Sequence, residues 1–426
     1  MEAQAEIRDA LERARAGTHL LLEPISDDEL VAQTSLLTSP IVWEYARLAA
    51  FEELWLLRSL DGNPSVSDRH REVQEALSHE HDHPSLPPLP PAAVRAYAED
   101  VRTRVLGALE HLDLDAPNAL LRNRFVFGLV IQNELQRQEA MLQTLQLRGA
   151  AEYPLPKPTT PDRAPGGPVE IHVPAGLFVL GAVNEPWAYD NELEPHDIEL
   201  RSFWIDRAPV TNRDFAEFVE DRGYHARRMW SPEGWEWREH EDASLPLYWD
   251  DDDGEWQRTR FGRREPLPPD EPVQHVSWYE ADAFARWAGK RLPTEIEWER
   301  AAGWHDHEGN FRYPWGQEWM GFEASLDRVR FSPAPVGSYA GGVSPVGCVQ
   351  MGGDVWEWTS SRFQPYPGFL AFPYPECSEI YFGDAYRVLR GGSWATAALV
   401  ARTSFRNWDH PYRRQLFAGF RCARDG

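Results

Sequence analysis

The sequence contains few cysteines. Its 426 residues include only three, Cys348, Cys377 and Cys422, and no two of them form a CxxC pair. This scarcity excludes a disulfide-rich scaffold and a zinc ribbon, and it suits a reducing cytoplasm.

Basic side chains are also in short supply. The chain has 43 Lys and Arg against 68 Asp and Glu, a formal net charge of -25. Such a charge repels phosphate backbones and anionic lipid, so we expect no nucleic-acid or membrane partner. No apolar run is long enough to span a bilayer, and the opening "MEAQAEIRDALERARAG" lacks the apolar core of a signal peptide. We therefore expect a cytoplasmic protein.

What the chain does contain is a clear division into two domains. The segment "AAEYPLPKPTTPDRAPGGP" is dense in Pro and Gly and predicts an interdomain linker over residues 149–168. Before it, apolar residues recur at three- and four-residue spacing, which predicts four or five amphipathic helices and a bundle over residues 1–148. After it, short strand-like pieces alternate with turns rich in Gly, Pro, Asn and Asp, and only "NRDFAEFVED", "WYEADAFARWAGK" and "TEIEWERAA" look helical. Residues 169–426 are thus predicted to form an α+β domain.

Several long motifs in the second domain resemble a known family. They include "FWIDRAPVTNRDFAEFVEDRGY", "PVQHVSWYEADAFARWAGKRLPTEIEWERAA", "DVWEWTSS", "RVLRGGSW" and "RTSFRNWDHPYRRQLFAGFRCAR". In this order they are similar to the formylglycine-generating-enzyme (sulfatase-modifying-factor) domain, which has an irregular C-type-lectin-like fold. The N-terminal "SPIVWEYARLAAFEELWLLRSLDG" resembles the DinB-like four-helix bundle joined to that domain in ergothioneine-pathway sulfoxide synthases. The resemblance implies a non-heme iron(II) enzyme that uses dioxygen to join a thiol to the imidazole of hercynine.

The iron-ligand positions depart from the family pattern. The family has two histidines in an H-x-x-x-H-x-E helix and a third in the "SP-x-VW" helix. Matching "NELQRQE" to that pattern puts Asn133 and Arg137 at the first two positions and keeps Glu139 as the acidic end. Arg47 stands at the third. Guanidinium groups cannot ligate a cation and would repel it, so we expect no iron and no other required cofactor.

Two interpretations of the replaced positions remain open. In the first, each Arg pairs with an acid of the bundle, Glu44, Glu134 or Glu139, and keeps a formerly cationic pocket neutral. In the second, the two guanidiniums and the amide of Asn133 bind an anion such as a carboxylate or phosphate, because Arg is the usual residue for bidentate anion recognition. A third possibility is iron held by other residues.

The residues expected to contact the substrate match the family pattern better than the iron-ligand positions do. By resemblance, Asn407 and Trp408 lie near the trimethylammonium and carboxylate ends of hercynine, Asp409 and Arg413 hold the thiol substrate, and Gln136 is a further hercynine contact. An indole face suits a quaternary ammonium through cation–π attraction. Aromatic residues in a domain with so many Trp are equally often part of the core.

Other positions argue against an intact thiol site. Tyr374 falls where the family has a tyrosine thought to deliver a proton, whereas Cys377 replaces a second pocket tyrosine. The family's "NPRS-x-R" loop is replaced by "ALSHEHDHPSLPPLP", which contains no Arg to grip a glutamyl carboxylate. The histidines of that loop could bind a transition metal if extended, but a solvated loop is the simpler interpretation; they are His79, His81 and His83.

The resemblance raises the question of two further metals, copper and calcium. The segment "ATAALVARTSFR" holds no cysteine, which excludes the copper chemistry of formylglycine-generating enzymes. Calcium in the loops of the second domain stays an expectation, although Ser325 occupies an Asn position.

Two functions are consistent with these residues. The first is a non-catalytic or altered paralogue that binds a betaine- or thiohistidine-like small molecule, or a pathway protein. The second is an active oxidoreductase that forms a C–S bond between a hercynine-like imidazole and a thiol, or performs another chemistry in the same pocket with Tyr374 and Asp409.

Overall fold

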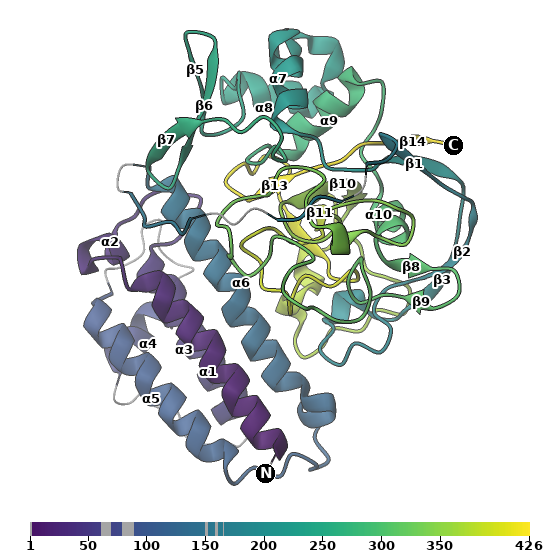
Figure 1. The fold of residues 1–426 in the computed structure, drawn as a ribbon. Coiled ribbons are helices and arrows are strands. Elements are labelled where there is room, and N and C mark those ends of the chain that lie inside the picture. The colour runs from purple at the N-terminus through teal and green to yellow at the C-terminus, as the bar shows by residue number, and fades with distance from the viewer. Residues whose placement is uncertain (1, 61–69, 79–88, 150–151, 158–160, 165) are drawn as a thin grey trace. The chain divides into compact units, whose positions relative to one another are not determined.

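The structure is a computed structural model that describes residues 2–60, 70–78, 89–149, 152–157, 161–164 and 166–426. The chain divides into two compact units, Met1–Pro154 and Leu155–Gly426. Helices make up the first unit, and strands, helices and long irregular segments make up the second (Figure 1). The predicted order of a helical half followed by an α+β half is confirmed.

Long helices packed side by side form the first unit (Figure 1). Its elements are α1 (Glu2–Leu22), α2 (Asp27–Val31), α3 (Ile41–Glu52), the π-helix η1 (Glu53–Ser59), α4 (Arg71–Ser78), α5 (Pro91–Leu109), the 3₁₀-helix η4 (Ala119–Arg124) and α6 (Phe125–Leu147). Apolar periodicity in the sequence predicted all of the longer helices, but it did not predict the short helix α4. Ser26 caps α2 in a capping box with Glu29, as a Ser followed three residues later by Glu favours.

The bundle core contains a buried charge network as well as apolar side chains. The carboxylates of Glu52 and Glu134 accept hydrogen bonds from Arg15 and Arg102, with Arg15 Nε to Glu134 Oε1 at 2.7 Å and Arg102 Nε to Glu52 Oε1 at 2.6 Å. Thr18 donates to Glu134 Oε1 at 2.8 Å. Two cations balance two anions, so the network is neutral and joins α1, α3, α5 and α6. Burial of such a network is tolerated only because its members are paired.

In the described part of the second unit, the strands form five small sheets. The strands are β1 (Glu170–Val173), β2 (Gly176–Leu180), β3 (His196–Leu200), β4 (Phe203–Asp206), β5 (Trp249–Asp252), β6 (Glu255–Arg260), β7 (Arg263–Pro266), β8 (Trp304–His305), β9 (Gly309–Asn310), β10 (Trp356–Arg362), β11 (Arg387–Arg390), β12 (Asn407–Asp409), β13 (Ala418–Gly419) and β14 (Ala423–Asp425). Their orders are β12-β11-β10-β13, β1-β4-β14, β5-β6-β7, β2-β3 and β8-β9.

The α-helices that accompany these sheets are α7 (Asn212–Glu220), α8 (Pro232–His240), α9 (Trp278–Trp287) and α10 (Glu295–Gly303). Thr211, Ser277 and Thr294 cap α7, α9 and α10 in capping boxes. The sequence predicted these three but missed α8, because "PEGWEWREH" has no apolar stripe and its two tryptophans, two residues apart, lie on opposite sides of the helix. The remaining turns are the 3₁₀-helices η5 (Asp190–Glu192), η6 (Gly223–His225), η7 (Arg227–Met229), η8 (Ala340–Gly342), η9 (Pro375–Cys377) and η10 (Glu379–Tyr381).

None of the helices in the described part of the chain combines the length and apolar character needed to cross a bilayer. The histidines of segment 79–83 lie outside the described residues, so the interpretation of that loop stays a prediction.

Candidate functional site

In the bundle, two of the three positions that were matched to the family's iron ligands, Arg47 and Arg137, contact one carboxylate, that of Glu44. Arg47 lies one turn after Glu44 on α3, and its Nη1 donates to Glu44 Oε1 at 2.5 Å. Arg137 on α6 donates from Nη1 to the other oxygen, Oε2, at 2.7 Å. A single acid therefore bridges the two guanidiniums and connects α3 to α6.

These groups are shielded from water to different extents. The side chains of Glu44, Arg47 and Arg137 are 10%, 15% and 30% exposed. Arg47 is held further by Ser39, whose Oγ accepts from Nη2 at 2.9 Å, and its guanidinium lies over the Trp43 ring at 5.7 Å. Because Arg47 has several contacts and Arg137 is more exposed, Arg47 is the more firmly fixed of the two.

The amide of Asn133, at the remaining matched position, differs from the arginines. Asn133 lies one turn before Arg137, and its Oδ1 is buried without a hydrogen-bond partner in the described structure. Glu134, the next residue, points into the core and pairs with Arg15 and Arg102 rather than with either replaced position. Gln136 donates from Nε2 to the Gln132 carbonyl at 3.1 Å.

This donor set does not fit an iron(II) ion. Both guanidiniums are hydrogen-bond donors without a lone pair for a metal, and they use both oxygens of Glu44. Among the side chains that the structure describes, no group of three or more His, Cys, Asp or Glu is arranged to hold a metal.

In the second unit, four predicted site residues lie together on one strand and the turn after it. Asn407, Trp408 and Asp409 form β12 and pair with β11. Arg413 follows one turn later, with its Nε 3.4 Å from Asp409 Oδ1. Burial raises the pKa of Asp409, while the Arg413 guanidinium opposes that rise. The pair offers one anion and one cation at adjacent points, as recognition of a zwitterionic amino acid requires.

Trp408 has less free ring surface than the sequence suggested. Phe363 stacks on it with ring centroids 4.1 Å apart and planes 10° from parallel. Tyr381 lies 5.5 Å away at a tilt of 42°. One indole face is therefore covered, and a cation could reach only the other face or the edge. Composition gave no sign of Phe363 or Tyr381 as neighbours.

Tyr374 immediately precedes the short 3₁₀-helix η9, and Cys377 is the last residue of that helix. The Cys377 N–H donates to the Tyr374 carbonyl at 3.1 Å, and the next residue, Ser378, donates its hydroxyl to Asp190. Burial and the nearby carboxylates of Asp190 and Glu192 raise the pKa of Cys377 well above its usual range. The thiol stays protonated at neutral pH and is a poor nucleophile.

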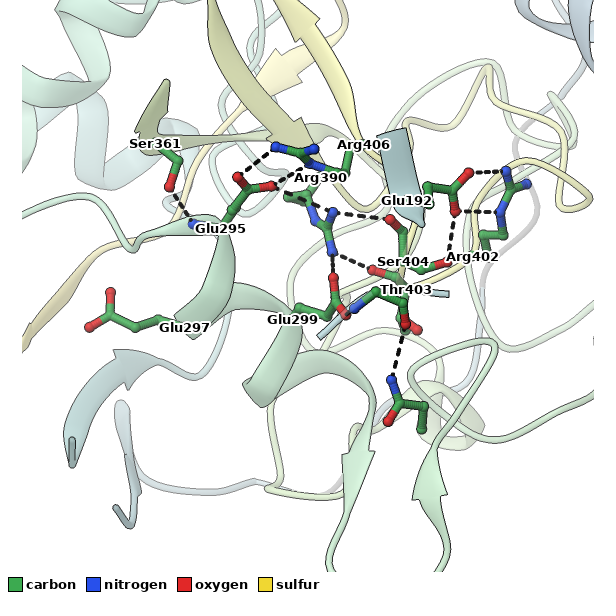
Figure 2. A network of polar contacts seen from close by, with 12 residues as sticks. Glu192, Glu295, Glu297, Glu299, Ser361, Arg390, Arg402, Thr403, Ser404 and Arg406 are labelled. Carbon is green, nitrogen blue, oxygen red and sulfur yellow. Dashed lines mark hydrogen bonds and ion pairs between the residues drawn. The ribbon is translucent and has the colours of Figure 1, made fainter. Parts of the chain in front are cut away.

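A buried network of Arg–Glu pairs fixes the chain that leads into β12 (Figure 2). Arg406, the residue before Asn407, pairs with Glu295 at 2.8 and 2.9 Å. Ser404 and Arg402 both donate to Glu192, Ser404 Oγ at 2.8 Å. These contacts bring together residues about 100 to 200 positions apart, which no local pattern in the sequence reveals.

The calcium expectation concerned Ser325. Its hydroxyl donates to the Ser332 carbonyl at 3.1 Å, a hydrogen bond between two nearby segments of the chain. Calcium binding stays a prediction.

Comparison with known proteins matches both halves of the chain. Residues 157–426 match the sulfatase-modifying factor enzyme 1-like domain, and residues 10–141 match the DinB superfamily. The hercynine oxygenase of Mycolicibacterium smegmatis is 45% identical, with all of both chains covered. The hercynine oxygenase of Mycobacterium tuberculosis is 44% identical, again with full coverage of both chains, and that of Mycolicibacterium thermoresistibile is 45% identical, with 99% of this chain and 95% of the relative covered. With both domains matched and the identity extending over the full length, the chain belongs to the hercynine oxygenase family.

Proposed function

We propose that this protein is a member of the family that has lost the iron site, and that it binds a betaine- or thiohistidine-like small molecule, or a protein of the same pathway, without iron-dependent turnover. The observation that carries this proposal is the carboxylate of Glu44 shared by Arg47 and Arg137. A metal would have to displace two charge-assisted hydrogen bonds and then sit beside two guanidiniums. At 4 Å, like unit charges repel by about 4 kcal/mol at an effective dielectric constant of 20.

The ligand class follows from the second unit. The Asp409–Arg413 pair and the partly exposed rings of Trp408 and Tyr381 suit a small molecule that carries a carboxylate and an ammonium group. The net charge of -25 supports the absence of nucleic-acid and membrane partners, and the three unpaired cysteines support a cytoplasmic location.

A second candidate is an active oxidoreductase that couples a hercynine-like imidazole to a thiol, or carries out an altered reaction in the same pocket. It is favoured by the retention of Asn407, Trp408, Asp409 and Arg413 together with Tyr374. In that case Tyr374 is the first residue to test as a proton donor.

One experiment separates the two. The untagged protein is purified, its metals are measured by elemental analysis, and it is incubated in air with hercynine, a thiol and added iron(II). The Mycolicibacterium smegmatis relative serves as the positive control. We expect no stoichiometric iron and no sulfoxide by mass spectrometry, together with heat on titration of hercynine into the metal-free protein. An iron-dependent sulfoxide product would establish the second candidate instead.

A further inference from the structure

An open cavity lies in the second unit, formed by residues that the preceding argument does not use. It has a volume of about 420 Å³. Its walls are the Asp206–Thr211 loop after β4, the first two turns of α7, the end of α9 and the chain at Gly167–Val169. Small-molecule sites typically occupy about 300–1,000 Å³, so the cavity is large enough for a compact ligand.

The charges that line the cavity are unbalanced. Three carboxylates, Asp206, Asp214 and Glu217, face two basic side chains, Arg207 and Lys290. Lys290 Nζ is 2.6 Å from Asp206 Oδ1, which neutralises that pair.

The acids on α7 differ in how they are held. Asp214 accepts from the Thr211 hydroxyl at 2.6 Å in the capping box. Glu217 lies one turn later on the same face of α7 and is exposed, and the described structure gives its carboxylate no hydrogen-bonded or ion-paired partner. With Asp206 paired to Lys290, the two acids Asp214 and Glu217 face one further cation, Arg207, so the lining keeps one net negative charge.

An aromatic wall stands beside these acids. Phe284 and Trp287 line the cavity with ring centroids 5.4 Å apart. Trp287 is fixed by the hydrogen bond from its Nε1 to Asp221 Oδ2 at 2.7 Å. Val210 and Val336 add apolar surface. A carboxylate, an indole ring and apolar side chains thus line the same cavity. These groups together can attract an organic ammonium group, through ion pairing and cation–π attraction.

We propose that this cavity is a binding site for a small organic cation, an ammonium group on a short apolar body, with Glu217 as the counter-ion and Trp287 as the aromatic wall. The net charge of -25 raises the local concentration of cations around the protein and supports this choice. The site is separate from the residues around Asp409, so it does not depend on the function proposed above.

Choline and its uncharged isostere, in which a tert-butyl group replaces the trimethylammonium group, provide the test. Both have the same shape, so a difference in affinity reports the charge alone. Binding is followed by NMR through the Trp indole N–H signals, with the Trp287 signal assigned from Trp287→Phe. We expect choline to shift the Trp287 signal at concentrations where the isostere does not. We also expect Glu217→Gln to weaken choline binding by about threefold, the size of an exposed ion pair.

Three further variants make the result specific. Ala288→Arg places a cation and extra volume at an exposed position of the cavity wall, and it should abolish the shift of Trp287 without unfolding the protein. Glu239→Gln, an exposed acid on α8 outside the cavity, should change nothing. Trp408→Leu should also leave the choline-induced shift of the Trp287 signal unchanged. This result would show that the shift does not come from choline bound near β12. Equal binding of choline and the isostere, or full binding by Glu217→Gln and Ala288→Arg, would overturn the proposal.

Discussion

The shared carboxylate in the bundle allows a quantitative prediction about the pairing of Arg47 and Arg137. Glu44 accepts from Arg47 at 2.5 Å and from Arg137 at 2.7 Å, and all three side chains are at least two-thirds buried. In Glu44→Gln the size is kept, but the amide can accept from only one guanidinium and turns its NH₂ donors toward the other. Two cations then face each other without an anion between them. We expect the bundle to lose about 3–4 kcal/mol, within the range for breaking a buried ion pair.

Removal of one arginine should cost less. In Arg137→Ala, Glu44 keeps Arg47, and the deleted side chain is 30% exposed, so the buried-pair figure must be reduced. We expect a loss of about 1–2 kcal/mol, between an exposed pair and a hydrogen bond to a charged group. Since a domain of about 150–250 residues shifts by about 2–4 °C per kcal/mol, the melting temperature should fall by roughly 2–8 °C.

The free energy of unfolding of both variants is measured by far-UV circular dichroism during thermal and urea unfolding. The double variant Glu44→Gln with Arg137→Ala then gives the coupling energy between the two positions. Arg95→Ala is the matched control. Its ion pair with Asp27 is also 2.5 Å long and lies in the same unit, but the side chains are 49% and 58% exposed, so its loss should change stability much less than the loss of the Glu44 pairs. If the two arginines instead formed a binding site for an anionic ligand, they would repel each other in the ligand-free protein, and Arg137→Ala would relieve that repulsion. A neutral or stabilising effect of that change, or a Glu44→Gln effect no larger than the control's, would refute the pairing.

Three other predictions follow from particular positions. The triple change Arg47→His, Asn133→His and Arg137→His should create iron(II) affinity detectable by calorimetry under nitrogen, because imidazoles four residues apart on α6 project together; a folded bundle that binds no iron would mean that the α3–α6 spacing differs from the family's. Burial raises the pKa of Asp354 to about 7, so the folded state binds more protons than the unfolded state between about pH 4 and 7, and stability should fall as pH rises through that window. Asp354→Asn, at a left-handed position (φ 61°) that Asn tolerates, should remove this slope and raise the melting temperature at pH 8 relative to the wild type, and an unchanged slope would contradict the assignment. Replacing the three histidines of segment 79–83 with Ala should leave the melting temperature unchanged with and without zinc, and a large loss would identify a structural metal site there.

The sequence by itself determined the helical half, the α+β half and most of their helices. Apolar periodicity and capping signals are local, so α1, α3, α5 and α6 could be predicted, as could α7, α9 and α10 with their Ser or Thr caps. It also determined which residue types stand at the positions that the motif match assigns to the family's iron ligands, because family motifs align position by position. Helix α8 was missed since its aromatic residues follow no period.

Only the tertiary structure decided which charges meet. The sequence offered Glu44, Glu134 and Glu139 as partners for the arginines. Spacing along a single helix favours Glu44 for Arg47 and Glu134 for Arg137, each three residues away, and says nothing about contacts between helices. Packing of α3 against α6 turns Glu44 toward both arginines and turns Glu134 into the core network with Arg15 and Arg102. Likewise, the stacking of Phe363 on Trp408 joins residues 45 positions apart in the chain. Ion pairs and ring stacks between distant segments depend on the relative placement of whole helices and strands, and single-sequence periodicity carries no information about that placement.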